Sequence, residues 1–100
     1  MKLWVDDVRP APRMYIWLKA VDEAKVFIQM ATSNGNDTIE LIDIDHDAGD
    51  FAQFGGDYIK LLDWLEETGR SYPIRIHSMD PVGVENMRRI IQRNDWTEVK

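Results

Sequence analysis

Both histidines of this chain and a group of carboxylates stand at the ends of short apolar segments. Asp6 and Asp7 end the first such segment, Asp45–Asp47 (an Asp-His-Asp triplet) ends another, and His77 ends a third. Two histidines that titrate near neutral pH can act as general base and general acid. Crowded carboxylates repel one another and attract a hard cation such as Mg²⁺. These residue types therefore predict proton transfer on a small charged ligand, with a cation as partner.

A phosphate-binding site is predicted just beyond the third segment. Asp80–Pro81 has the residue types of a helix N-cap and a first helical position. The free N–H groups and the positive dipole end of a helix bind anions, so Ser78 and Gly83 are candidate phosphate contacts. Arg9 offers a guanidinium from the loop after the first segment. The simpler alternatives are that Asp80 only caps the helix and that Ser78 is only a hydroxyl at the helix entry.

The elements that position these residues alternate between strand and helix patterns. Short apolar runs predict strands, and apolar residues at helical spacing predict helices. The strands are expected at residues 2–6, 15–18, 38–45, 74–78 and 96–99. The helices are expected at residues 21–31, from an N-cap at Asp57 to Gly69, and from an N-cap at Asp80 to 93, with Val84 among the buried residues of the last helix.

This order predicts an α/β fold with a mostly parallel sheet of about five strands. Ligands of such sheets bind outside the carboxyl ends of the strands, which is where the ionisable residues fall. If the strands before His46 and His77 are neighbours, their backbones lie about 4.8 Å apart, and the two imidazoles straddle a small ligand. The link between the first two strands is too short for a crossover helix, so the second strand either runs parallel after a loop or pairs antiparallel.

Composition limits the classes of function. One hundred residues make a single domain, residues 1–100. The absence of cysteine excludes disulfides, thiolate metal sites and cysteine nucleophiles. A net charge of −6 disfavours binding along a nucleic-acid duplex. No apolar run approaches the roughly 20 residues of a membrane helix, and the N-terminus has no signal-peptide pattern. We therefore expect a soluble cytoplasmic protein that does not contact membranes.

Several of these residues also have ordinary structural explanations. His46 fits a surface loop residue, His77 fits a buried structural histidine, and the Asp6–Asp7 pair fits a solvated turn. Asp43 lies on the same strand face as Asp45, and the pattern leaves open whether it belongs to the site or is an edge charge. The four tryptophans fall on predicted elements, which favours core packing over base stacking.

Three blocks of the chain together resemble a known family. The block at residues 2–10 (KLWVDDVRP), the block at 45–49 (DHDAG) and the block at 74–83 (IRIHSMDPVG) are similar to the cyclic-phosphate-processing receiver-like domains. The chain departs from the usual pattern at Ala48, where leucine is common, and at Asp80, where asparagine is common. The resemblance implies a receiver-like (flavodoxin-like) three-layer α/β fold that lacks the last receiver helix. Because that helix is a usual dimer surface of receivers, we expect a monomer or weak dimer.

The resemblance also assigns residues by position. Asp6, Asp7 and Asp45 match the acidic receiver site that holds Mg²⁺, and Ser78 matches its strand-four hydroxyl. The histidines His46 and His77 are the family's own additions. The catalytic residues that we expect are His46, His77, Asp45 and Asp47. Lys100 is a candidate for the lysine that receivers carry after strand five.

Three functions remain open at this level. The first is a phosphoesterase that opens 2′,3′-cyclic phosphates of RNA ends or cyclic nucleotides, with one histidine activating water and the other protonating the leaving oxygen. The second is a non-catalytic module that binds a cyclic nucleotide or other small phosphorylated ligand. The third is a signalling receiver in which Asp45 accepts a phosphoryl group. The expected ligand is therefore a small phosphorylated molecule or a cyclic-phosphate RNA end.

Overall fold

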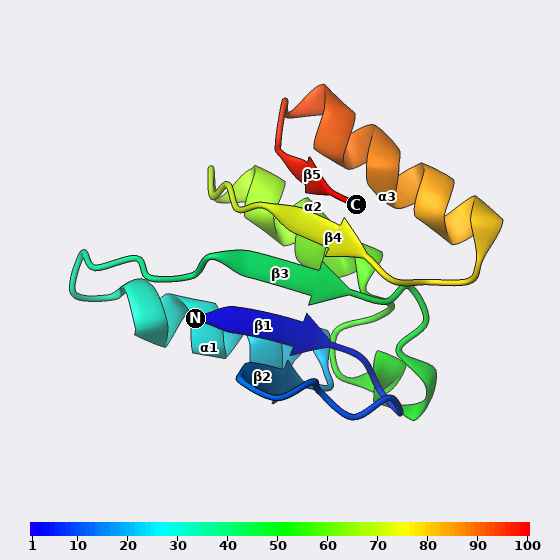
Figure 1. The fold of residues 1–100 in the computed structure, drawn as a ribbon, viewed down its shortest axis with the longest axis horizontal. Helices are drawn as coiled ribbons and strands as arrows, with labels where there is room; N and C mark the ends of the chain where they lie inside the picture. Colours follow the sequence, from blue (N-terminus) through cyan, green and yellow to red (C-terminus); the bar gives the residue numbers. More distant parts are fainter.

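The computed structural model describes all residues from 1 to 100 (Figure 1). Five strands and three α-helices alternate along the chain, as expected. The strands are β1 (Lys2–Val5), β2 (Tyr15–Leu18), β3 (Leu41–Ile44), β4 (Ile74–Ile76) and β5 (Glu98–Val99). The helices are α1 (Val21–Thr32), α2 (Ile59–Glu67) and α3 (Pro81–Arg93), with a short 3₁₀ helix at Gly49–Gln53 between β3 and α2. No helix has the length and apolar character needed to span a membrane.

The five strands form one sheet in the order β2-β1-β3-β4-β5, and every neighbouring pair is parallel. Val5 pairs in register with Leu18 on one side and with Ile44 on the other. The parallel sheet and its neighbouring β3 and β4 confirm the receiver-like class. The alternative of an antiparallel β2 is wrong: residues 6–14 form a loop long enough to return to the start of a parallel strand.

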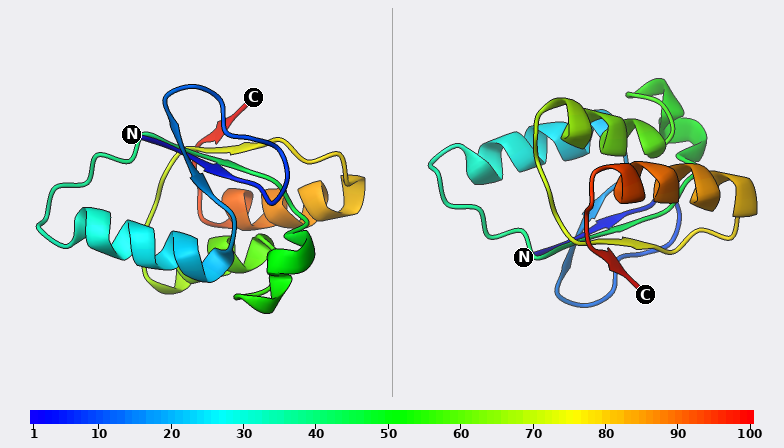
Figure 2. Two further views of the ribbon diagram at one scale, coloured as in Figure 1. Left: turned by 90° about the horizontal axis from the view of Figure 1, so that it is seen from below. Right: turned by 90° about the horizontal axis from the view of Figure 1, so that it is seen from above.

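The handedness of the connections decides where the helices lie. The connections from β2 to β3, β3 to β4 and β4 to β5 all advance in the same direction across the sheet. Right-handed crossovers in one direction fall on one face, and Figure 2 shows all three helices on that face. The link from β1 to β2 runs the other way, and loop 6–14 accordingly crosses the opposite face. The predicted three-layer fold would have helices on this second face as well. The structure has loop 6–14 there instead of a helix layer.

The hydrophobic core lies between the sheet and the three helices. Each strand turns one set of alternating side chains toward the helices; Leu3 and Val5 of β1 are fully buried there. Burying one such side chain is worth about 1.5–3 kcal/mol. The core also includes the buried residues Ile42, Ile44, Leu61, Leu62, Leu65, Ile74, Met87 and Ile91. This packing holds the carboxyl ends of β1, β3 and β4 in fixed register.

The start of α3 agrees with its sequence signals. The Asp80 side chain accepts a hydrogen bond from the Val82 N–H at 3.1 Å, and Pro81 is the first helical residue. Within the helix, Gly83 is buried and Val84 is only half-buried. The prediction that Val84 is a core residue is therefore wrong, because the helix turns Gly83 inward.

The start of α2 differs from its prediction. Tyr58, not Asp57, precedes the helix, and no side chain caps it. The Asp57 carboxylate instead accepts a hydrogen bond from the Ala48 N–H at 3.2 Å. Asp57 therefore closes the loop between β3 and α2, which ties the segment after Asp45 to the helix layer.

The last strand is held to the helix layer by one charged pair. Arg88 of α3 donates from Nε and Nη2 to the two oxygens of Glu98 at 2.7–3.0 Å. Glu98 lies opposite Ile74 in the β4–β5 pairing. Such a bidentate pair gives both energy and geometry. It positions a strand of only two residues at the sheet edge.

Candidate functional site

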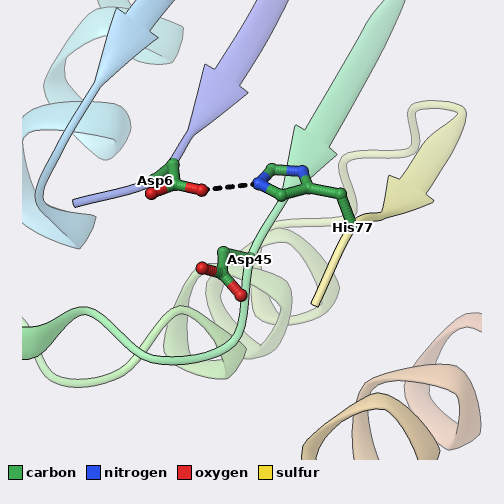
Figure 3. A group of neighbouring side chains, drawn as sticks. All are labelled: Asp6, Asp45 and His77. Atoms are coloured by element: carbon green, nitrogen blue, oxygen red, sulfur yellow. Dashed lines mark hydrogen bonds and ion pairs between the residues drawn. The ribbon is translucent and has the colours of Figure 1, made fainter. Parts of the chain in front are cut away.

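The candidate site lies where the carboxyl ends of β1, β3 and β4 meet. Connections leave β1 and β3 in opposite directions, and this switch in direction is the place where open α/β sheets bind ligands. Figure 3 shows the Asp6 carboxylate and the His77 ring facing each other from the ends of β1 and β4, with Asp45 beside them at the end of β3. The structure therefore brings together the first carboxylate segment, the Asp-His-Asp triplet and the second histidine.

His77 is held between two carboxylates. Its Nδ1 lies 2.7 Å from Oδ1 of Asp43, and its Nε2 lies 2.8 Å from Oδ2 of Asp6. The imidazole is 6% exposed, and both carboxylates are at most 1% exposed. Ionised carboxylates only accept hydrogen bonds, so both ring nitrogens must carry protons. The imidazole is therefore a cation, and neither nitrogen is free to exchange a proton with a ligand.

The surroundings of His77 reinforce its positive charge. Burial disfavours the charged ring, but the hydrogen bonds and negative charges of Asp43 and Asp6 outweigh burial and raise its pKa. The indole of Trp4 stacks on the imidazole, with ring centroids 3.9 Å apart and planes 3° from parallel. A cation over an indole face gains further stabilisation. On the far side of Asp43, Arg75 donates to Oδ2 at 3.0 Å.

Asp6 has no free oxygen. Its Oδ1 accepts the backbone N–H groups of Val8 and Arg9, both at 2.9 Å, and its Oδ2 faces His77. Burial acts to raise the pKa of Asp6, but the two backbone hydrogen bonds and the imidazolium together lower it. Asp6 is therefore a fixed anion that shapes the start of loop 6–14.

Asp7 has the opposite electrostatic environment. Burial, joined by the negative charges of Asp6, Asp45 and Asp47, raises its pKa. No basic side chain forms an ion pair with Asp7 or Asp45. The Asp7 carboxylate packs against Gly49, where a side chain would collide with it. Uncompensated negative charge is therefore concentrated at this point of the site.

A divalent cation fits part of this donor set. Ligand atoms of Asp6, Asp45 and His77 lie within 4.8 Å of one another, but Asp6 and His77 are already bonded to each other. Of the three carboxylates expected to bind Mg²⁺, Asp7 and Asp45 keep oxygens that face no basic partner. Carboxylate oxygens suit this hard ion. The fit is therefore partial: Asp45 is the member of this group without a basic partner, and Asp7 adds negative charge nearby.

The second histidine occupies a different place. His46 packs on Gly83 at the start of α3, so closely that a Cβ at residue 83 would overlap the ring. Its Nδ1 lies 3.4 Å from an Asp80 oxygen, and the side chain is 20% exposed. Gly83, expected as a phosphate contact, is buried beneath this ring. His46 is thus an accessible imidazole at a helix N-terminus, with a carboxylate beside one nitrogen.

The other expected site residues lie at the rim. The Ser78 hydroxyl accepts the Asp80 N–H at 3.1 Å, as a helix-entry residue does. Arg9 reaches the carbonyl of His77 with Nη1 at 3.3 Å. Asp47 accepts the Gly49 N–H at 2.8 Å. Lys100 pairs with Glu98 at 3.1 Å on the β5 edge.

The site is an open surface. No enclosed cavity occurs in the structure, so the expected acidic pocket is a shallow edge of the sheet. A ligand here would contact the loops after β1, β3 and β4 from one side.

Two residues of the site were not assigned from the sequence. The sequence pattern does not decide the role of Asp43, and for Trp4 it favours core packing. A signal for Asp43 existed, because a carboxylate inside an apolar strand is stable only with a buried partner. The stacking of Trp4 on His77 joins residues 73 positions apart, and no local pattern reveals it.

Comparison with known proteins supports the same class. No curated protein and no solved structure matches the chain at a significant level. The family match covers the whole chain up to the end of α3, and it therefore includes all three strand ends that form the site. Residues 1–93 match the family described as cyclic-phosphate processing Receiver domain, and the chain belongs to that family.

Proposed function

We propose that this protein is a phosphoesterase that opens a cyclic phosphodiester, such as a 2′,3′-cyclic phosphate, to a monoester. The observation that carries the proposal is the partly exposed imidazole of His46 beside the N-terminus of α3, at the same sheet edge as the acidic group around Asp7. The family name points to the same class of substrate. In this reaction water attacks phosphorus, one ring P–O bond breaks, and the leaving oxygen takes a proton.

His46 and Asp7 are the proton-transfer groups of this proposal. His46 has a partly exposed ring with an Asp80 oxygen 3.4 Å from Nδ1, an arrangement that orients the ring. Asp7 is the carboxyl group of the site whose pKa is raised by burial and by its acidic neighbours. One group removes the proton of the attacking water, and the other supplies a proton to the leaving oxygen. Asp45 and Asp47 supply negative charge beside this pair.

His77 has a different role from the one expected for a second general acid or base. Both its nitrogens face carboxylates, so it serves as a fixed positive charge that orients Asp6. The N–H groups at the start of α3, Ser78 and Arg9 are the proposed phosphate contacts. If Mg²⁺ is bound by Asp7 and Asp45 instead, the ion would neutralise charge that develops on the phosphoryl oxygens, and His46 alone would exchange a proton.

The test is phosphorus NMR of a 2′,3′-cyclic nucleotide with the purified protein, with Mg²⁺ and with a chelator. We expect conversion to a monoester and a loss of about 100-fold or more in kcat/KM for His46→Asn. Asn86→Ala, on the exposed side of α3, is the matched control and should keep full activity. Full activity of His46→Asn would contradict the assignment of His46.

A second candidate is a non-catalytic binder of cyclic phosphates. The open site and the engaged nitrogens of His77 favour it, because an enclosed site with two free histidines is what efficient hydrolysis would use. Broadening of the phosphorus signal without conversion, lost in Arg9→Ala, would support binding alone. Conversion at a rate that depends on His46 would exclude this alternative.

A further inference from the structure

One face of the sheet carries no helix. All three helices lie on the other side, and only loop 6–14 crosses this face (Figure 2). Sheets made entirely of parallel strands are almost always covered on both faces. The uncovered part of this face is therefore a surface on which a further element is expected to pack.

The side chains on this face follow from strand alternation. Lys2 lies beside Tyr15 and Leu41 in the pairing register, and Arg75 lies beside Val99. Tyr15, Leu41 and Trp17 are only half-buried, and Val99 is 36% exposed. We call this surface the open face; it consists of Lys2, Tyr15, Trp17, Leu41, Arg75 and Val99.

The charges on and beside the open face are basic. The Lys2 ammonium lies 5.6 Å from the ring centre of Tyr15, and that of Lys19 lies 4.3 Å from the ring centre of Trp17. The Arg75 side chain is 43% exposed. The acidic residue of these strands on this side, Asp43, is buried and bonded to Arg75 and His77. A positive surface thus occurs in a chain whose net charge is −6.

We propose that the open face is a docking surface for an acidic amphipathic helix of a partner protein. The apolar side of that helix would cover Tyr15, Leu41 and Val99, and its flanking carboxylates would meet Lys2, Lys19 and Arg75. Helices are the elements that cover parallel sheets, and the five strands of this face, about 4.8 Å apart, give room for one helix. Two copies joined through this same face would bring like charges together, which disfavours self-association here.

The test uses two synthetic 18-residue helical peptides with leucines on one side. One carries glutamates along the flanks, and the other carries lysines at the same positions. Each is titrated into isotope-labelled protein and followed by amide chemical shifts. We expect the acidic peptide to shift amides of β1, β2 and β4 and to bind at least about ten times more tightly than the basic peptide.

A charge-matched pair of variants tests the location. Lys2→Glu with Lys19→Glu should weaken binding of the acidic peptide about ten-fold. Lys25→Glu with Lys60→Glu, on α1 and α2 of the helix layer, changes the net charge equally and should change affinity less than about two-fold. Circular dichroism checks that each variant is folded.

Several results would overturn the proposal. Equal affinity for both peptides, equal loss in the two double variants, or shifts confined to the helices would exclude this docking surface. Absence of shifts at about 1 mM acidic peptide, a concentration that detects even weak complexes, would do the same. Tighter binding of a single-stranded oligonucleotide to β2 and β4 would assign the face to nucleic acid. Self-association in sedimentation that Lys2→Glu abolishes would assign it to a second copy.

Discussion

His77 carries a positive charge at a point where two buried carboxylates require one. An isolated carboxylate away from water is strongly destabilising, and a paired and hydrogen-bonded one is tolerated. The imidazolium pairs with Asp6 and Asp43 together, while Trp4 covers its ring. This group fixes Asp6 and thereby the start of loop 6–14. The ion pairs of His77 with Asp6 and Asp43 therefore both position the charged groups of the site and stabilise the fold.

Replacing His77 by glutamine should destabilise the protein and change its pH dependence. The pKa of His77 is raised in the folded state, so its contribution is fully present below the unfolded value of about 6.5 and is lost as pH rises through the folded value. We expect His77→Gln to lower the free energy of unfolding by about 3 kcal/mol near pH 6. Urea unfolding of both proteins from pH 6 to pH 9 should show the difference shrinking. A difference that grows with pH would contradict the charged state.

Replacing Asp7 should have the opposite effect on stability from replacing His77, because ionised Asp7 lowers the free energy of unfolding. Its pKa is raised by burial and by three neighbouring carboxylates, so ionised Asp7 disfavours the folded state and stability falls as pH rises through the folded pKa. We expect Asp7→Asn to raise the free energy of unfolding by about 0.5 kcal/mol or more at pH 7. Thermal unfolding with and without Mg²⁺ should show that the ion stabilises the wild type more than Asp7→Asn. An equal effect of Mg²⁺ on both would argue against a cation at Asp7.

Two elements meet at His46: the loop after β3 and the first turn of α3. The ring of His46 takes the volume that a side chain at residue 83 would fill. Glycine in a helix interior is usually unfavourable by about 1 kcal/mol relative to alanine, so its presence here is explained by the ring that packs on it. The position of His46 is therefore set by the spacing of two elements.

Gly83→Ala should separate the position of His46 from the stability of α3. Alanine favours the helix, while its Cβ displaces the imidazole, so we expect a change of less than about 1 kcal/mol in the free energy of unfolding. Turnover of a cyclic nucleotide should fall by about 10- to 100-fold, since a displacement near 1 Å has effects of this size. Full turnover of Gly83→Ala, with an unchanged His46 ring signal in NMR, would refute the packing role of Gly83.

The position of the β5 strand depends on a contact with α3, the ion pair between Arg88 and Glu98. Two residues pair with β4, and the Ile74 N–H donates to the Thr97 carbonyl at 2.9 Å. Arg88→Gln removes the bidentate contact and leaves Glu98 paired only with the exposed Lys100 of its own strand end, so β5 loses its link to α3 and should open locally. We expect hydrogen exchange of the Ile74 amide to become about ten times faster, while exchange of the Ile42 amide in β3 stays unchanged. Equal acceleration at both amides would instead indicate global destabilisation.

The whole molecule is one layer of helices packed on one sheet, with all three helices contributing to the same core. The surface is asymmetric: the helix side completes the core, the strand ends hold the ionised groups, and the opposite face is partly uncovered. The proposed catalysis and the proposed partner binding therefore use different surfaces that share β1 and β4.

Unfolding should be a single cooperative transition. Trp4 and Trp17 lie on the open side of the sheet, and Trp64 and Trp96 lie near the helices, so fluorescence reports on both sides. We expect the urea midpoints from fluorescence and from far-ultraviolet circular dichroism to coincide, as for most single domains of this size. Midpoints that differ would show that β5 or the β1–β2 region unfolds separately.

The elements and their order were predictable because their signals are local. Apolar runs identified β1 and β2 closely, and Asp80–Pro81 located the start of α3. Strand ends were less accurate: the expected strand at residues 38–45 is reduced to Leu41–Ile44, because pairing with neighbours, not residue type, decides where a strand stops. The family was also predictable from three short blocks of sequence.

The chemistry of the site depended on contacts between distant parts of the chain. The sequence alone determined that acidic residues and both histidines stand at strand ends, since each follows directly from an apolar run. Only the tertiary structure decided that His77 lies between Asp6 and Asp43, that His46 lies alone on Gly83, and that the strand ends form an open surface. The physical reason is that pairing register and crossover handedness, which set these distances, arise from packing of the whole sheet.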